Sequence, residues 1–203
     1  DPLGTWCNWN LPDNSFGPNT VNLFGDFPKL GIDQNAVYVT SNMFNIPAAG
    51  RSFQGTRVRV IPKAQLLDNA CGPVTWNDMW DLRDPNNLTA RIFTVTPAIV
   101  FGTPDQQFLF SDAPYTTGTF VTLWELFDPI GTPFLVGTNV PVTASRVPTN
   151  ADQLGGSATL IDGGINRSFR HAPVYRDGHM WGVQGVAGGT NNAFAFVRYL
   201  RIN

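Results

Sequence analysis

Residues 96–111 read TPAIVFGTPDQQFLFS, and their pattern decides the fold class. Two short apolar runs flank a turn rich in Gly, Pro and Asp, and these residue types accept the backbone angles that a hairpin turn requires. The same plan occurs twice more, since residues 27–40 read FPKLGIDQNAVYVT and residues 172–183 read APVYRDGHMWGV. The three segments lie about 70 residues apart. The sequence therefore predicts a β-hairpin that is repeated three times.

A second recurring element is a Gly-Thr pair followed by an alternating strand of aromatic and β-branched residues. Alternation with a period of two is typical of a strand that buries one face. The element occurs at 4–11 (GTWCNWNL), 55–61 (GTRVRVI) and 118–124 (GTFVTLW), and more loosely as Gly189-Thr190 followed by 194–200 (FAFVRYL).

Together the two elements give a unit of four short strands, which is typical of a blade in a β-propeller. We therefore expect an all-β, β-propeller-like array of about three four-stranded blades, with residues 4–11 as an orphan strand from a neighbouring blade. The alternative is a β-sandwich. The composition favours an all-β chain, because Glu and Lys, which fill exposed helix faces, contribute only one and two residues.

The whole chain, residues 1–203, is expected to form a single propeller segment. Known propellers close with about four to eight blades, so three blades would leave two open flanks with unpaired edges and apolar faces. We expect a second chain segment or a symmetry-related copy to complete the array. The start at Asp1 rather than Met favours a processed product or a part of something longer.

The overall composition excludes several classes of protein. With 42% hydrophobic and 12% aromatic residues, the chain has the apolar surface that a disordered chain lacks. A net charge of −2 argues against nucleic acid as a partner. No apolar run reaches the ~18 residues that a membrane span requires.

The two cysteines, Cys7 and Cys71, are expected either to form a disulfide or to remain two independent buried thiols. A disulfide would indicate an oxidising compartment, and hence a secreted, extracellular protein. His171 and His179 could complete a set of four metal ligands by number, but the spacing matches no zinc pattern. We therefore expect no metal and no cofactor.

Two stretches of this chain resemble a family of secreted bacterial β-propeller proteins that are mostly uncharacterised. Residues 25–31 and 36–44 are similar to that family's D-Y-P-x-L-G segment and its following Y-x-T-x-N-x-F strand, and residues 172–181 to its A-V-Y-R-D-G-x-L-W strand pair. The resemblance implies the propeller fold and secretion, and it implies no reaction. Where the family has G-D-S-R, this chain has Gly164-Ile165-Asn166-Arg167, so the Arg is kept and the Asp is not.

The candidate ligand-binding residues precede the first strand of each hairpin. In a propeller these strands are innermost, so the residues before them converge on the central axis. A carboxylate, hydroxyls, guanidinium groups and an imidazole there would suit a sugar. The alternative is structural, with turn caps, surface ion pairs and solvated side chains. The candidates are Asp26, Thr94, Thr96, Arg167, Arg170 and His171.

Trp76 and Trp80 are a further candidate site. They lie four residues apart beside Asp78 and Asp81, and this spacing predicts a short helical turn with an exposed aromatic edge.

Three classes of function remain open. The first is an extracellular binding or scaffold protein that recognises a glycan or another protein, because no catalytic constellation is evident. The second is a glycoside-active enzyme, a hydrolase or lyase, that uses Asp carboxylates in the propeller channel. The third is a structural surface or filament protein that assembles with itself, since low charge favours close packing.

Overall fold

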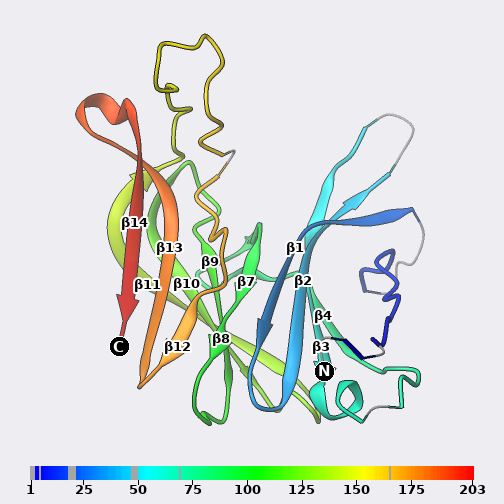
Figure 1. The fold of residues 1–203 in the computed structure, drawn as a ribbon. Coiled ribbons are helices and arrows are strands. Elements are labelled where there is room, and N and C mark those ends of the chain that lie inside the picture. The colour runs from blue at the N-terminus through cyan, green and yellow to red at the C-terminus, as the bar shows by residue number, and fades with distance from the viewer. Residues whose placement is uncertain (1–2, 5, 18–21, 47–49, 69, 165) are drawn as a thin grey trace.

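The computed structural model confirms an all-β chain (Figure 1). Its described residues form fourteen strands and two short 3-10 helices, at Lys63–Leu66 and Thr190–Asn192. In this part of the chain no helix is long and apolar enough to cross a membrane. The described ranges are 3–4, 6–17, 22–46, 50–68, 70–164 and 166–203.

The first four strands form a meander in which each strand pairs antiparallel with the next. The first predicted hairpin is confirmed, and Asp33 holds its turn by accepting hydrogen bonds from the backbone N–H of Asn35 (2.7 Å) and of Ala36 (2.8 Å). The Tyr38 hydroxyl donates to the same carboxylate at 2.7 Å. The strands are β1 (Leu23–Ile32), β2 (Ala36–Asn45), β3 (Phe53–Pro62) and β4 (Asn77–Trp80).

A second meander follows, in the order β7, β9, β10, β11. The predicted hairpin at 96–111 is present, but its first arm is divided: β7 belongs to this sheet, and β8 (Ile99–Val100) joins another. A small separate hairpin precedes it, formed by β5 (Arg83–Asp84) and β6 (Asn87–Arg91). The meander comprises β7 (Val95–Pro97), β9 (Gln107–Asp112), β10 (Thr117–Phe127) and β11 (Phe134–Arg146).

The third predicted unit has three strands rather than four among the described residues. They are β12 (Val174–Arg176), β13 (His179–Gly188) and β14 (Phe194–Ile202), again antiparallel in chain order. The short β8 pairs in parallel with both β1 and β12. The first and third units thereby become one eight-stranded sheet, β14-β13-β12-β8-β1-β2-β3-β4.

The sheets pack face to face, as the layers of a sandwich do. Successive residues of β9 point to opposite faces of the four-stranded sheet. On one face, Leu109 packs in a core with Tyr38 and Val60 of the first unit. On the other, Phe110 packs in a core with Met180 of the third unit. The four-stranded sheet therefore lies between the two halves of the eight-stranded sheet, and the described strands do not close into a ring.

The expected orphan strand at 4–11 is wrong. The described residues from 6 to 15 form no strand, and the segment lies against the first unit without pairing to its edge. The reason is that buried side chains hold it by its backbone: Arg59 donates to the Pro12 carbonyl at 2.7 Å and Arg57 to the Ser15 carbonyl at 3.1 Å. Arg57 also pairs with the Asp13 carboxylate.

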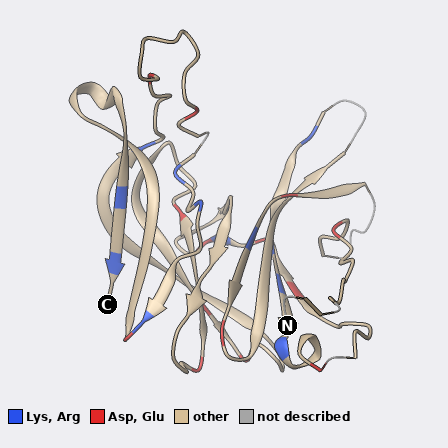
Figure 2. Ribbon diagram, viewed as in Figure 1, with Lys and Arg blue, Asp and Glu red and all other residues tan. Residues whose placement is uncertain are grey.

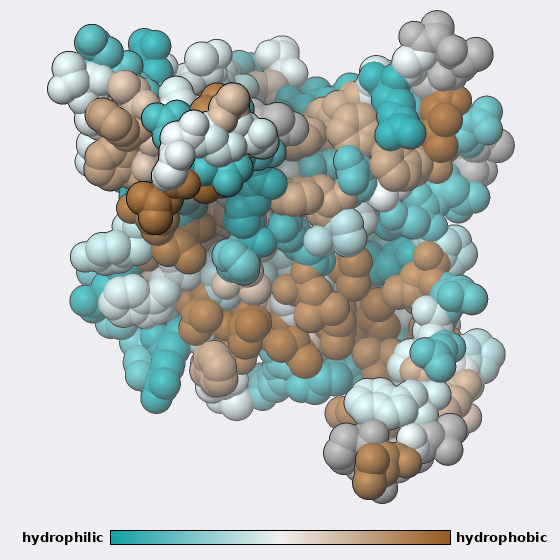
Figure 3. Space-filling view, turned by 45° about the horizontal axis from the view of Figure 1, so that its top comes forward, coloured by the Kyte–Doolittle hydropathy of each residue, from teal (hydrophilic) through white to brown (hydrophobic). Residues whose placement is uncertain are grey.

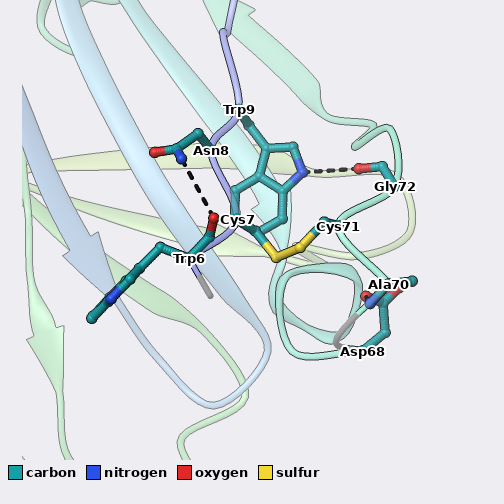
Figure 4. Close-up of a disulfide and its surroundings, with 8 residues drawn as sticks. All are labelled: Trp6, Cys7, Asn8, Trp9, Asp68, Ala70, Cys71 and Gly72. Carbon is teal, nitrogen blue, oxygen red and sulfur yellow. Dashed lines mark hydrogen bonds between the residues drawn. A yellow bond between two sulfur atoms is a disulfide. The ribbon is translucent and has the colours of Figure 1, made fainter. Parts of the chain in front are cut away.

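The Cys7–Cys71 disulfide is confirmed (Figure 4). It links the N-terminal segment to the loop between β3 and β4. The indole N–H of Trp9 donates to the Gly72 carbonyl at 2.8 Å beside it. The disulfide therefore ties the N-terminal segment to the outside of the first unit.

Candidate functional site

A cavity of about 290 Å³, here the loop-end pocket, lies where loops of different units meet. Aromatic rings, polar side chains and charged groups contribute to its wall. The lining residues are Phe53, Arg91, Phe93, Asp112, Ala113, Pro114, Tyr115, Val147, Asn166, Arg167 and Ser168. They come from the start of β3, the end of β6 and the loop after it, the β9–β10 loop and the segments that precede β12.

A buried ion pair lies in the wall of the loop-end pocket. The Nε of Arg167 is 2.9 Å from an oxygen of Asp112, and the two side chains are 1% and 8% exposed. Arg167 also donates to the carbonyls of Thr116 (2.7 Å) and Tyr115 (2.8 Å). Through these contacts Arg167 holds the β9–β10 loop in place. Gly118 makes room for it, because a Cβ there would lie 2.7 Å from Nη2.

The carboxyl group of Asp112 is buried in the wall of this pocket. Burial raises its pKa, and the Arg167 guanidinium opposes that rise. One of its oxygens, Oδ1, is buried and accepts no hydrogen bond from another side chain. A buried carboxyl with a raised pKa and an oxygen without a hydrogen-bond partner is a common feature of ligand-binding and acid–base sites.

The ring of Tyr115 forms another part of the wall, and a hydrogen bond of its hydroxyl fixes its position. Its hydroxyl donates to Asp84 at 2.7 Å, and Asp84 also accepts from the Asn139 side chain at 2.7 Å. Burial alone would raise the pKa of Asp84, but these hydrogen bonds and one from the Asn86 backbone lower it. The Tyr115 side chain is 41% exposed, so the ring remains accessible.

A smaller cavity of about 90 Å³ adjoins the first and shares Phe93 and Asn166 with it. Asp26, Phe27, Asn42 and Arg170 complete its wall. The Arg170 guanidinium lies 5.0 Å from the centre of the Phe27 ring, and the Lys29 ammonium lies 3.7 Å from that centre. Partial burial and the charge of Arg170 lower the pKa of Lys29. One cation, Arg170, and one carboxylate, Asp26, therefore line this cavity, and Lys29 lies against the ring of Phe27 in its wall.

Backbone strain is present beside the smaller cavity. Thr94 has φ = 62°, in the left-handed region that a β-branched residue rarely adopts. Asn42 holds it there by accepting from the Thr94 backbone N–H at 2.9 Å and donating to the Thr94 hydroxyl at 2.7 Å. Strain of about 1–3 kcal/mol persists only where surrounding contacts impose it, and it occurs often at binding sites.

The sequence-predicted residues divide into two groups. Asp26 and Arg170 line the smaller cavity, Arg167 lines the loop-end pocket, and Thr94 is bonded to Asn42, which faces the smaller cavity. The structure thus brings these four close together. Thr96 instead is fully buried and donates to the Phe169 carbonyl at 2.8 Å, as a structural contact.

The remaining predicted residues lie elsewhere. His171 is exposed and lines neither cavity. The helical turn predicted around Trp76 and Trp80 is wrong, because residues 77–80 form strand β4. The Arg59 guanidinium covers the Trp76 ring at 4.5 Å, whereas Trp80 is 44% exposed. These tryptophans therefore lie on the first unit and not at the pockets.

Sequence reasoning missed the aromatic and amide residues of the loop-end pocket, above all Phe93, Tyr115 and Asn166. Asn166 lies directly before Arg167, in the segment that aligns with the G-D-S-R of the resembled family. Among the described residues, no group of three or more His, Cys, Asp or Glu side chains could hold a metal ion.

Comparison with known proteins finds no matching family model, curated protein or solved structure. The resemblance to secreted bacterial propeller proteins therefore remains a prediction from the residues that carry it.

Proposed function

We propose that this chain is an extracellular binding protein of β-propeller type and that its loop-end pocket binds a saccharide. The observation that carries the proposal is the pocket itself, which combines exposed aromatic surface with convergent polar groups. At about 290 Å³ it is close to the lower end of small-molecule sites, which begin near ~300 Å³. A ligand of one or two sugar rings is the expected size.

The arrangement of the strands supports the propeller type. Each of the three units is an antiparallel meander in chain order, and each packs against its neighbour through its own core. The strands β1, β8 and β12, from the starts of the three units, lie side by side in parallel. The disulfide supports secretion, because such bonds persist in oxidising compartments.

The chemistry of the wall supports a saccharide. A sugar ring has apolar C–H faces that pack on aromatic rings, here Phe93 and Tyr115. Its hydroxyls require donors and acceptors at the edges, which the Arg91 guanidinium, the Asn166 amide and the Asp112 carboxyl can provide.

A glycan array followed by calorimetry on each glycan that binds tests the proposal. We expect Arg91→Ala and Tyr115→Ala each to weaken binding at least tenfold, which corresponds to about 1.4 kcal/mol. Arg176→Ala is the matched control, because this exposed arginine lies at the β12–β13 turn and lines neither cavity of the proposed site. Binding that both pocket variants retain in full, or an array on which nothing binds, would contradict the proposal.

A second candidate function is glycoside cleavage. It is favoured by the raised pKa of Asp112 and by Asp26, whose carboxylate lines the adjoining cavity. A glycosidase requires one carboxyl as acid and another as base or nucleophile across the scissile bond. Turnover of a bound glycan that is lost in both Asp112→Asn and Asp26→Asn would identify an enzyme, whereas binding without turnover would identify a binding protein.

A further inference from the structure

Two basic side chains, those of Lys29 and Arg170, meet beside the smaller cavity, and we call them the basic pair. They come from β1 and from the coil that precedes β12, and Figure 2 shows basic residues on both of these segments. The Lys29 ammonium donates to the Arg170 carbonyl at 2.9 Å. Both cations lie against the ring of Phe27, at 3.7 Å and 5.0 Å from its centre. A hydrogen bond and a shared ring therefore hold two positive charges close together.

The basic pair has no acidic partner among the residues that the structure describes. Within that part of the chain, no carboxylate lies within the ion-pair distance of about 4 Å from either cation. Asp26 lines the same cavity, but one of its oxygens accepts the backbone N–H of Phe27 at 2.8 Å. Partial burial and the charge of Arg170 both lower the pKa of Lys29. Two like charges held together without a counter-ion favour the binding of an anion.

The backbone on both sides holds the basic pair in place. Phe27, whose ring carries both cations, has φ = 54° and lies in a β-bulge between Asp26 and Lys29. Bulges of this kind redirect side chains and occur often beside functional sites. On the other side, Gly164 makes room for the guanidinium, because a Cβ there would collide with Nη2 of Arg170. The pair is thus fixed by the surrounding chain, and Arg170 remains exposed.

The smaller cavity connects the basic pair with the loop-end pocket. Arg170 lines the smaller cavity, and Phe93 and Asn166 belong to the walls of both. At about 90 Å³, against about 290 Å³, the smaller cavity suits a substituent of a ligand rather than a further ring. The loops between β2 and β3 and between β11 and β12 lie at the top of Figure 1 and come forward in Figure 3, where hydrophilic residues are interspersed among hydrophobic ones.

We propose that the basic pair binds the acidic group, a carboxylate or a sulfate ester, of a saccharide whose rings occupy the loop-end pocket. This inference rests on the proposed function and narrows its ligand to acidic saccharides. A guanidinium binds two oxygens of such a group with parallel hydrogen bonds, and an ammonium adds a point charge. Because the two cavities share part of their walls, one ligand can extend from the pocket to the pair.

A glycan array that presents uronic acid and sulfated glycans tests the inference. Each glycan that binds is then compared by calorimetry with its neutral counterpart, in which the carboxylate is reduced to an alcohol or the sulfate is removed. We expect the acidic form to bind at least tenfold more tightly. The counterpart that loses affinity also identifies which of the two acidic groups is bound.

Arg170→Gln and Lys29→Gln should each remove most of this difference and leave the binding of the neutral counterpart unchanged. Arg176→Gln is the matched control, because this exposed arginine lies at the β12–β13 turn and lines neither cavity. Equal melting temperatures should show that all three variants are folded. Acidic and neutral forms that bind equally, or a preference that survives both substitutions in the pair, would overturn the inference and leave the saccharide proposal standing.

A titration with sodium sulfate, followed by the NMR signals of the arginine Nε–H groups, tests the basic pair without a sugar. The Arg170 signal should shift saturably with sulfate and not with sodium chloride at the same ionic strength, whereas the Arg176 signal should not respond to either. No response of Arg170 would overturn the inference. A saturable response in a protein that binds no glycan would instead refute the saccharide function and retain the pair as an anion site.

Discussion

Removing the Cys7–Cys71 disulfide should cost this protein a large part of its stability. The bond closes a loop with a sequence separation of 64 residues. In the chain-entropy description, a loop of that length stabilises the folded state by about 4 kcal/mol. Total stabilities of single domains are ~5–15 kcal/mol, so the double variant Cys7→Ser/Cys71→Ser should be markedly less stable.

The structure indicates where the loss will appear first. Without the bond, the N-terminal segment is held mainly by hydrogen bonds that the side chains of Arg57 and Arg59 donate to its backbone carbonyls. These two arginines are 1% and 2% exposed. Hydration of these arginines should make the segment detach before the sheets separate. We therefore expect limited proteolysis to cut within residues 6–17 before it cuts the sheets.

Urea unfolding, followed by tryptophan fluorescence, measures the effect. The wild type with reductant should approach the double variant, and reductant should not change the variant further. Two results would refute the reasoning: a change below about 1 kcal/mol, which would place it among ordinary surface substitutions, or alkylation of both thiols in unreduced wild-type protein.

Three other substitutions have defined outcomes. Arg167→Met should lower the free energy of unfolding by about 3–5 kcal/mol at pH 7, because it leaves Asp112 buried without its counter-charge. Urea midpoints should show this loss becoming smaller as acid protonates Asp112. Gly118→Ala should cost about 1–3 kcal/mol by calorimetry, since its Cβ would collide with Arg167, whereas Gly72→Ala, with open space around its Cβ, should be nearly neutral. Asp84 has a lowered pKa in the folded state, so its stabilising effect should be present above pH ~4 and lost as the pH falls further. Asp84→Asn should therefore flatten the acid limb of the stability profile between about pH 2 and 5, and an unchanged limb would argue against that role.

The sequence predicted the hairpins because their signals are local. Alternation and turn residues lie within a few positions of each other, and Asp33 closes its turn with neighbours two and three residues away. Residues 4–11 show the limit of such reasoning. Their alternation resembles a strand, but a strand requires a hydrogen-bonded neighbour, and the described residues among them form no strand. Arg59 and Arg57 instead fix the chain just after them, at the carbonyls of Pro12 and Ser15.

The candidate site was predictable in position but not in composition. The rule that residues before the innermost strands converge brought out Asp26 and Arg170, which do line one cavity. The pair Asn42–Thr94 and the pair Asp112–Arg167 join positions more than 50 residues apart. Such pairs depend on how loops of different units pack, and no local pattern encodes that. A spacing of four residues places two side chains on one face of a helix and also on one face of a strand. The spacing of Trp76 and Trp80 therefore could not distinguish a helical turn from the strand that is present.

The layered order of the two cores also bears on how the chain folds during synthesis. The core between the first and second units consists of residues between Ala36 and Leu135, and the other core of residues from Ala98 to Ile202. Because each unit packs on its neighbour in sequence, the first core can close while the third unit is still being made. The second unit would then already be folded, and β12, β13 and β14 would pack against it last.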